Sequence, residues 1–329
     1  MVDRLPSYRK LVFSSVIGPE SLAFDDDNGG PYTGVSDGRI LKYNHTNSRS
    51  HHGSDGWINF AVPPRHKGVR GEECEGTSNV TMEDKCGRPL GLQFHRATRD
   101  LYIADAYYGL LRVSQKGGVA TKLAASAEGV GFGFTNGVDV DQRTGMVYFT
   151  DSSAKFHRMD WIWIFATNDD TGRFMSYDPQ TKEVKVLIRN LEFPNGVSLN
   201  RDGRFVLICE SVKKRILRYW LRGPQVGTVD VFANLTQSPD NIKMNLHGEF
   251  WVALNSGRGT IHKVGTEGEE LTMESQETDV IGTKFDESGE VLEVLDHSDI
   301  MNTVSEVMEN NETLWLGSAV ASFVAMYVP

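Results

Sequence analysis

One short pattern occurs six times along this chain of 329 residues and constrains its fold more than any other feature. In each copy a small or polar residue follows the first position, two apolar residues then alternate with polar ones, and a polar residue usually closes the copy. Such alternation is typical of β-strands. The copies start 41 to 70 residues apart, at Glu20, Leu90, Asn136, Asn195, Asp240 and Ile281.

A polar turn and a second apolar run follow most of the copies. The turns include residues 142–145, 201–203 and 287–289, and the second runs include LYIADA, MVYFTDS and RFVLICES. This arrangement predicts a β-hairpin, and further short runs such as ILRYW supply outer strands. A repeat of roughly 40–45 residues with several short strands is typical of a propeller. We therefore predict an all-β, six-bladed β-propeller with four-stranded blades.

A propeller ring leaves no exposed strand edge only if the two ends of the chain meet. We expect the C-terminal run WLGSAVASFVAMYVP and the N-terminal run LVFSSV to complete one shared blade. The chain then forms a single domain, 1–329, with insertions at about 45–85 and 152–170. Long loops on a rigid scaffold often form the walls of a binding site.

Charge and hydropathy exclude two classes of partner. With 34 basic and 44 acidic residues the net charge is -10, and no basic stripe is present to bind the phosphates of a nucleic acid. No run of about 18 apolar residues occurs, so we expect no membrane span. The expected partner is a small molecule.

The cysteines and glycosylation sequons bear on the cellular compartment. Cys74 and Cys86 lie twelve residues apart in a polar stretch and could form a disulfide in an oxidising compartment, whereas Cys209 is expected to be a buried free thiol. The start, MVDRLPSYRK, lacks an apolar signal core, so the protein is either cytosolic or secretory with its signal peptide removed. Sequons favour the secretory route, although they also arise by chance. They begin at Asn44, Asn79, Asn234 and Asn311.

The first position of the repeat predicts a metal site. In a propeller this position converges on the axis from every blade, and calcium accepts amide as well as carboxylate oxygens, with about six to eight ligands. Alternatively, these side chains only cap turns or bond the neighbouring backbone. Leu90 and Ile281 are apolar members of the column. The predicted calcium ligands are Glu20, Asn136, Asn195, Asp240 and Asn241.

Calcium with open positions polarises a carbonyl or phosphoryl oxygen, and a ligating carboxylate can act as base or nucleophile. Asp240 is the first catalytic candidate and Glu20 the second, although either can serve only as a ligand. No Gly-x-Ser-x-Gly elbow and no histidine pair with metal-ligand spacing competes with this site.

The expected mouth of the propeller is rich in apolar residues, which suits a hydrophobic small molecule. Leu90, Tyr107 and Phe134 are the expected pocket residues on the blades. The insertion KFHRMDWIWIF adds His157 and Trp161, which contact substrate if the insertion overhangs the axis. The alternatives are a solvated loop histidine and a tryptophan that, like Trp163, only packs the insertion.

Longer segments resemble the plant strictosidine synthase-like proteins over nearly the whole chain. They are CGRPLG from Cys86, LYIADAYYGL, TNGVDVDQRTGMVYFTDSS, TGRFMSYDP, FPNGVSLNRDGRFVLICES and RYWLRGP. The resemblance implies a six-bladed propeller, a signal peptide, vacuolar or extracellular residence, and a disulfide between Cys74 and Cys86.

Strictosidine synthase joins tryptamine to secologanin by a Pictet-Spengler condensation, with a glutamate near the start of the last blade and no metal. Alignment on Leu314-Trp-Leu-Gly317 places Ser305 at the position of that glutamate and Glu306 one residue away. A slip of one residue turns a side chain to the other face of a strand. Condensation would therefore require Glu306 to reach the pocket.

The axial column instead resembles the paraoxonase and gluconolactonase relatives, calcium-dependent hydrolases of lactones, esters and organophosphates on the same fold. All five cluster positions match paraoxonase in type, but Leu90 and Tyr108 stand where its two histidines are expected. The resemblance implies a calcium-dependent hydrolase of a small lactone or ester, with calcium as Lewis acid. The alternatives are an amine-aldehyde condensing enzyme of alkaloid metabolism and a propeller that binds small molecules or proteins without chemistry, its calcium only joining blades.

Overall fold

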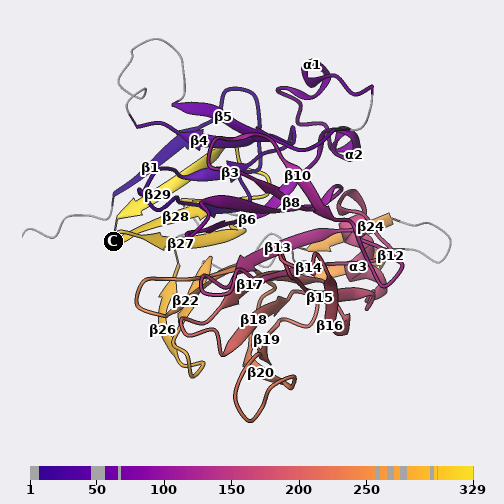
Figure 1. The fold of residues 1–329 in the computed structure, drawn as a ribbon, viewed down its shortest axis with the longest axis vertical. Helices are drawn as coiled ribbons and strands as arrows, with labels where there is room; N and C mark the ends of the chain where they lie inside the picture. Colours follow the sequence, from indigo (N-terminus) through magenta and orange to yellow (C-terminus); the bar gives the residue numbers. More distant parts are fainter. Residues whose placement is uncertain are drawn as a thin grey trace, which may run out of the picture.

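The computed structural model describes residues 7–45, 56–65, 68–255, 260–264, 270–274, 280–296, 300–301 and 303–328. Six sheets are arranged around a common centre as a six-bladed β-propeller (Figure 1). Each sheet has four antiparallel strands, and the first gains a short fifth strand that runs parallel to its neighbour. The predicted fold class is confirmed.

The first three blades follow the order of the chain. The first contains β2 (Leu22–Ala23), β3 (Tyr32–Gly34), β4 (Ile40–Tyr43), β5 (Trp57–Val62) and the added β9 (Gly118–Val119). The second contains β6 (Pro89–His95), β7 (Asp100–Asp105), β8 (Gly109–Val113) and β10 (Thr121–Ala124). The third contains β13 (Thr135–Val140), β14 (Val147–Asp151), β15 (Gly172–Tyr177) and β16 (Val184–Leu191).

The last three blades complete the ring. The fourth contains β17 (Pro194–Leu199), β18 (Phe205–Glu210), β19 (Arg215–Trp220) and β20 (Val229–Asn234). The fifth contains β21 (Pro239–Met244), β22 (Phe250–Leu254), β25 (Gly282–Phe285) and β26 (Val291–Leu295). The sixth contains β27 (Glu306–Asn310), β28 (Thr313–Gly317), β29 (Phe323–Val328) and β1 (Ser7–Val12).

The insertions between strands carry the remaining elements. Two hairpins are formed by β11 (Ser126–Ala127) with β12 (Val130–Gly131), and by β23 (Thr260–Val264) with β24 (Glu270–Glu274). The insertion after β5 holds α1 (Gly71–Cys74), the 3-10 turn Val80–Met82 and α2 (Glu83–Cys86). The insertion after β14 holds the 3-10 turn Arg158–Asp160 and α3 (Trp161–Thr167).

The two ends of the chain close the ring, as predicted. Strand β1 is the outermost strand of the sixth blade and pairs antiparallel with β29. Ser7 lies opposite Val328, and Val12 lies opposite Phe323. The last blade is therefore built from both ends of the chain, and the pairing of its third and fourth strands closes the ring.

The sixth copy of the repeat was assigned to the wrong strand. Ile281 precedes β25, which lies between β22 and β26 as the third strand of the fifth blade. The innermost strand of the sixth blade is β27, which begins at Glu306. Inner and third strands share the same two-residue alternation, so that pattern alone does not separate them.

The inner strands approach one another so closely that glycine is required between them. A Cβ atom on Gly137 would lie 2.5 Å from the backbone oxygen of Asn195, and one on Gly196 would lie 2.5 Å from the Cα of Asn241. Backbone atoms at that distance leave no room for a side chain. The repeated glycine after the first position thus sets the spacing of the blades at the axis.

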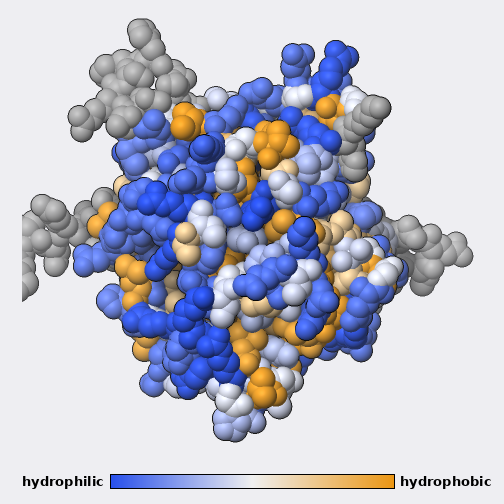
Figure 2. All heavy atoms as spheres, viewed as in Figure 1, coloured by the Kyte–Doolittle hydropathy of each residue, from blue (hydrophilic) through white to orange (hydrophobic). Residues whose placement is uncertain are grey.

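Apolar side chains fill the space between neighbouring blades. Phe205 and Leu207 of the fourth blade, for example, form one buried cluster with Ile242 and Phe250 of the fifth. On the face in Figure 2 hydrophobic residues appear only as small separate groups. Among the described residues no helix is long and apolar enough to cross a membrane.

Candidate functional site

A cavity of about 180 Å³ lies at the end of the ring where the inner strands begin. Its walls come from the starts of the first four inner strands, from the insertion after β14 and from loops of the last two blades. Of the predicted site residues, Glu20, Asn136, Leu90, Phe134 and Trp161 line it. The other lining residues are Arg158, Phe193, Asn255, Thr303, Ala319 and Val320.

A larger cavity of about 530 Å³ is lined by residues near the opposite ends of the inner strands and in the turns that follow them, including Asn28, Asp141 and Asn200. None of the predicted site residues lines it, as far as the described residues form its walls. The smaller cavity is therefore the candidate site.

The amide groups of the predicted metal cluster are oriented by hydrogen bonds. Asn195 Nδ2 donates to Asp240 Oδ1 over 2.6 Å and to Ser211 Oγ over 3.3 Å. Asn136 Nδ2 donates to Ser152 Oγ over 3.0 Å. Asn255 Nδ2 donates to Asp240 Oδ2 over 3.2 Å. Asp240 is thus held by the amides of Asn195 and Asn255. The NH₂ groups of Asn136, Asn195 and Asn255 all donate, which leaves their three carbonyl oxygens available.

Four buried oxygens in this region lack a hydrogen-bond partner within the described part of the chain: Glu20 Oε2, Asn136 Oδ1, Asn195 Oδ1 and Asn255 Oδ1. A buried oxygen without a partner is costly and calls for one. Carboxylate and amide oxygens are the ligands that calcium prefers, so this set fits the predicted ion. Asn241 differs, because its Nδ2 is the atom without a partner and its backbone N–H donates to Ser305 O over 2.9 Å.

The electrostatics of Glu20 agree with a site that needs a cation. Burial, followed by the nearby charge of Asp240, raises the pKa of Glu20 to about 8, although Arg88 and Arg158 act in the opposite direction. Only these two carboxylates belong to the predicted cluster. No group of three or more His, Cys, Asp or Glu side chains with metal-site geometry occurs among the described residues. A cation bound here would depend largely on amide oxygens.

Ser305 and Glu306 connect the last blade to the first. Ser305 Oγ donates to the backbone oxygen of Glu20 over 2.7 Å. The fully buried Glu306 carboxylate accepts hydrogen bonds from Leu22 N at 2.6 Å and Ser21 Oγ at 2.9 Å. Within the described residues, neither side chain is part of the cavity wall.

Tyr107, Tyr108 and His157 do not line the cavity formed by the described residues. His157 is exposed, lies with its Nδ1 2.9 Å from Gly133 O, and stacks on Tyr107 with ring centroids 6.0 Å apart. Tyr108 is buried and donates its hydroxyl to Lys85 O over 2.7 Å. Substrate contact by these three residues stays a prediction.

The apolar wall of the cavity contains a residue with an unusual backbone. Phe193 is buried and has φ +57°, a left-handed conformation that is rare for a bulky residue. Its ring contacts Phe134 at a centroid distance of 5.4 Å and Phe165 at 5.3 Å. Such strain persists only where surrounding structure holds it, and it is frequent at functional sites.

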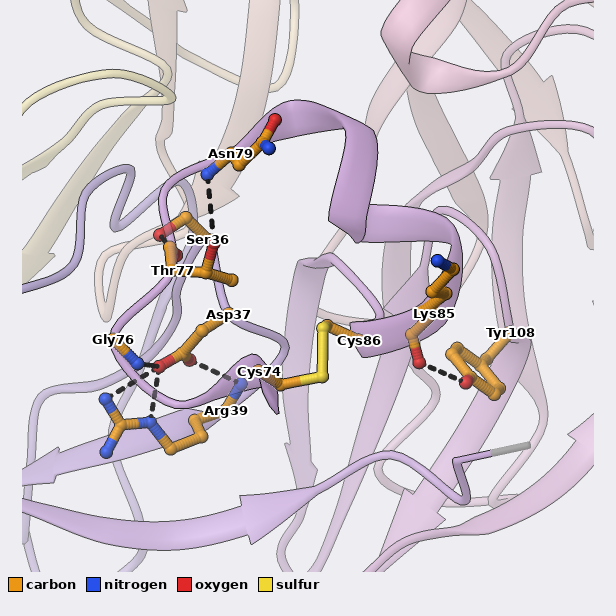
Figure 3. The surroundings of a disulfide bond; sticks show 10 residues. All are labelled: Ser36, Asp37, Arg39, Cys74, Gly76, Thr77, Asn79, Lys85, Cys86 and Tyr108. Atoms are coloured by element: carbon orange, nitrogen blue, oxygen red, sulfur yellow. Dashed lines mark hydrogen bonds and ion pairs between the residues drawn. A yellow bond between two sulfur atoms is a disulfide. The ribbon is translucent and has the colours of Figure 1, made fainter. Parts of the chain in front are cut away.

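The predicted disulfide joins Cys74 to Cys86 (Figure 3). It ties the end of α2 to the end of α1, and the adjacent Gly76 N donates to Asp37 Oδ2 over 2.8 Å. Cys209 is buried and free, as expected. Asn79, Asn234 and Asn311 are exposed and Asn44 is half-buried, while Thr46 of its sequon lies outside the described residues. Glycosylation stays a prediction.

Six residues at the cavity are not predicted from the sequence, and Asn255 and Arg158 are the two whose side chains matter most for the argument below. Asn255 directly follows β22, and the end of a second strand carries no repeated signature that would point to the axis. Arg158 had a signal, because it lies between His157 and Trp161 in the aromatic insertion. An arginine among aromatic residues in a long loop that forms a binding wall is a candidate ligand contact.

Comparison with known proteins identifies similar chains. The strictosidine synthase family profile matches residues 136–224, and the strictosidine synthase-like N-terminal profile matches residues 3–43. Protein strictosidine synthase-like 10 of Arabidopsis thaliana is 42% identical over 99% of this chain and 89% of its own length. Protein strictosidine synthase-like 3 of the same plant is 40% identical over 95% of this chain and 83% of its own length.

Solved structures agree on the fold. A gluconolactonase of Xanthomonas campestris is similar with a TM-score of 0.64 and 14% identity, covering 98% of this chain and 89% of its own. A luciferin-regenerating enzyme is similar with a TM-score of 0.63 and 12% identity, covering 98% and 95%. At this level of identity the likeness concerns the fold alone.

Proposed function

The chain belongs to the strictosidine synthase-like family, and we propose that it is a calcium-dependent hydrolase of a small lactone or ester. The observation that carries this proposal is the group of buried oxygens without partners around the cavity, on Glu20, Asn136 and Asn195. Asp240 and Asn241 would complete the ligand set predicted from the axial column. When bound, calcium would supply a Lewis acid for the substrate carbonyl.

The residues of the chain would supply proton transfer and positioning. In hydrolysis the water oxygen adds to the carbonyl carbon, the bond from that carbon to the ester oxygen breaks, and the proton lost by water passes to the ester oxygen. Glu20 lines the cavity, so its carboxylate would reach the substrate either as a ligand of the ion or in proton exchange. Asp240, whose oxygens accept hydrogen bonds from Asn195 and Asn255, would orient these amides or act as the base itself.

The apolar wall would bind the body of the substrate and exclude bulk water. Leu90, Phe134 and Phe193 are buried around the cavity, with Trp161 beside them. Electrostatic interactions with a carbonyl group strengthen when water is excluded from such a site. This composition supports a hydrophobic small molecule as the substrate.

Condensation of an amine with an aldehyde remains the alternative chemistry. It would use Glu306, whose carboxylate is buried against Ser21 and Leu22 and does not belong to the described wall of the cavity. No observation on the described residues therefore favours it over hydrolysis. We also propose residence in the secretory pathway, in the vacuole or outside the cell, which the disulfide and the three exposed sequon asparagines support.

The test combines metal content, stability and turnover on one preparation. Calcium per chain is measured, thermal unfolding is followed with and without a chelator, and a panel of lactones and aryl esters is assayed. The Glu20→Gln variant is compared with Glu290→Gln, a control on an exposed turn. Stoichiometric calcium, and turnover that is lost with the chelator and in Glu20→Gln alone, would support the proposal.

Two other outcomes would replace it. Stability that depends on calcium, without turnover of any ester or lactone, would identify a binding propeller whose ion only joins blades. A chain that binds no calcium would remove the metal site and leave condensation, which a mixture of aromatic amine and aldehyde then tests directly.

A further inference from the structure

We infer that Arg158 determines the specificity of the cavity, and that the molecule bound there carries an anionic group such as a carboxylate on a single-ring apolar body. The inference deepens the proposed hydrolase and rests on it for the reaction catalysed. The recognition of an anion can be measured without turnover.

Arg158 lines the cavity, and one nitrogen of its guanidinium is bound to Glu83. Its Nη1 donates to both oxygens of Glu83, at 2.7 and 2.9 Å. The side chain is 16% exposed, and within the described residues its guanidinium makes no other hydrogen bond. Because a guanidinium has five N–H donors in a fixed plane, Nε and Nη2 keep donors for a ligand.

Arg158 shares its ion-pair partner with a second arginine. Arg88 Nε lies 3.6 Å from the Glu83 carboxylate that Arg158 also contacts, and Asp105 and Glu20 act on Arg88 as further negative charges. Arg88 Nε and Nη1 lack hydrogen-bond partners in the described structure, and burial followed by repulsion from Arg158 lowers the pKa of Arg88 to about 10. In the proposed holoenzyme Glu20 and Asp240 would bind calcium, so Glu83 would remain the ion-pair partner of Arg158. An anion on the ligand would accept hydrogen bonds from the Nε and Nη2 donors that Glu83 leaves unused.

The size of the cavity limits the rest of the ligand. An engineered cavity of about 150 Å³ binds benzene, so a cavity of about 180 Å³ holds roughly one ring with a small substituent. Leu90, Phe134 and Trp161 supply an apolar surface for that ring. A one-ring acid therefore matches both the charge and the volume.

Two insertions hold Arg158 in position before a ligand arrives. Glu83 lies in α2, which the disulfide at Cys86 ties to α1. On the other insertion, the backbone N–H of Met159 donates to the Tyr107 hydroxyl over 3.2 Å, and that hydroxyl lies 3.3 Å from Glu83 Oε2. A cation fixed in this way loses little side-chain entropy on binding.

The test measures binding of benzoate and of its uncharged analogue benzamide, by calorimetry in the presence of calcium. Wild-type protein should bind benzoate more tightly than benzamide. Arg158→Gln should weaken benzoate binding by about tenfold or more, as expected for the loss of a hydrogen bond to a charged group, and leave benzamide unchanged. Arg158→Lys should restore part of the affinity for benzoate. Arg189→Gln, an exposed arginine of β16, is the control.

Thermal unfolding establishes that each variant is folded. The inference is overturned if wild-type protein binds neither ligand, if Arg158→Gln binds benzoate as wild-type protein does, or if it loses both ligands equally.

Assays with 4-carboxyphenyl acetate and phenyl acetate separate this inference from the proposed function. If both hold, Arg158→Gln raises KM for the charged ester alone and leaves kcat unchanged. Benzoate binding that depends on Arg158, with no hydrolysis of either ester, would remove the hydrolase and keep the anion site. If both esters are hydrolysed and the Arg158→Gln variant hydrolyses them as wild-type protein does, the hydrolase is kept and the anion site is removed.

Discussion

The Nζ of Lys243 lies 3.7 Å from Oε2 of Glu306, and the Glu306 carboxylate is fully buried. Lys243 belongs to the inner strand of the fifth blade and Glu306 to that of the sixth. The same ammonium donates to the backbone oxygen of Leu92, in the second blade, over 3.0 Å. One side chain thus joins three inner strands at the axis.

Removing Lys243 should leave the Glu306 carboxylate buried without its counter-charge, with only the hydrogen bonds from Ser21 and Leu22. The Lys243→Met variant should lose about 3–5 kcal/mol of unfolding free energy, the range for breaking a buried ion pair. The double variant Lys243→Met with Glu306→Gln should regain most of this loss. Urea unfolding of the four proteins in the cycle measures the coupling, and a double variant no more stable than Lys243→Met alone would contradict the pairing.

Asp105 should make stability depend on pH. Burial raises the pKa of its carboxyl to about 6, although the backbone N–H groups of Tyr107 and Tyr108 donate to it. Because this value exceeds the unfolded value of 3.8, the contribution of Asp105 to stability is complete below about pH 4 and is lost as pH rises through about 6.

The Asp105→Asn variant, which stays neutral, should therefore gain about 2–3 kcal/mol relative to wild-type protein between pH 4 and pH 7. Denaturant unfolding across this range measures the difference. Asp84→Asn, at an exposed position of α2, serves as control. A difference between Asp105→Asn and wild-type protein that is constant with pH would contradict the shift.

Gly196→Ala should force two inner strands apart. The new Cβ would lie 2.5 Å from the Cα of Asn241 and 2.7 Å from the backbone nitrogen of Ile242. Overpacking of this kind costs about 1–3 kcal/mol, and displacement of Asn241 should also weaken calcium binding. Gly131→Ala is a matched control, because nothing lies within 4 Å of its Cβ position. Equal stability of the two variants in urea would refute close contact at the axis.

The disulfide should contribute to stability and to the position of Arg158. Replacing both Cys74 and Cys86 by serine should cost about 3 kcal/mol, as expected for a short loop. Reductant should lower the Tm of wild-type protein and leave the Tm of the double variant unchanged. Cys209→Ala, which removes the buried free thiol, should remain as sensitive to reductant as wild-type protein. Insensitivity of wild-type protein to a strong reductant would argue against the bond.

Sequence reasoning recovered the fold because its strongest signal is repeated. Five of the six inner strands carry the expected pattern at their starts, and the close approach at Gly137 and Gly196 explains why glycine recurs there. The sixth inner strand begins Ser305-Glu306 and has no such glycine. The alternation at Ile281 predicts an inner strand wrongly, because every strand of a blade has the same two-residue period, whatever its distance from the axis.

The candidate site was recovered only in part, for a related reason. Glu20 and Asn136 line the cavity because they begin inner strands, which the repeat identifies. The contact of Arg158 with Glu83 joins two insertions that are far apart in the sequence. No local pattern encodes such a pairing, since it depends on how both insertions fold over the ring.

Pairing of β1 with β29 has a consequence for synthesis on the ribosome. Strand β1 is synthesised long before its partner β29, because Ser7 pairs with Val328 at the other end of the chain. At about 5–20 residues per second this interval is roughly 15–60 s. During that time β1 has no neighbour on which to pair, and the five preceding blades form an open arc whose last inner strand, β21, faces water. A nascent chain stalled before β27 would expose both ends of that arc, and the apolar surface there would favour aggregation until the sixth blade is made.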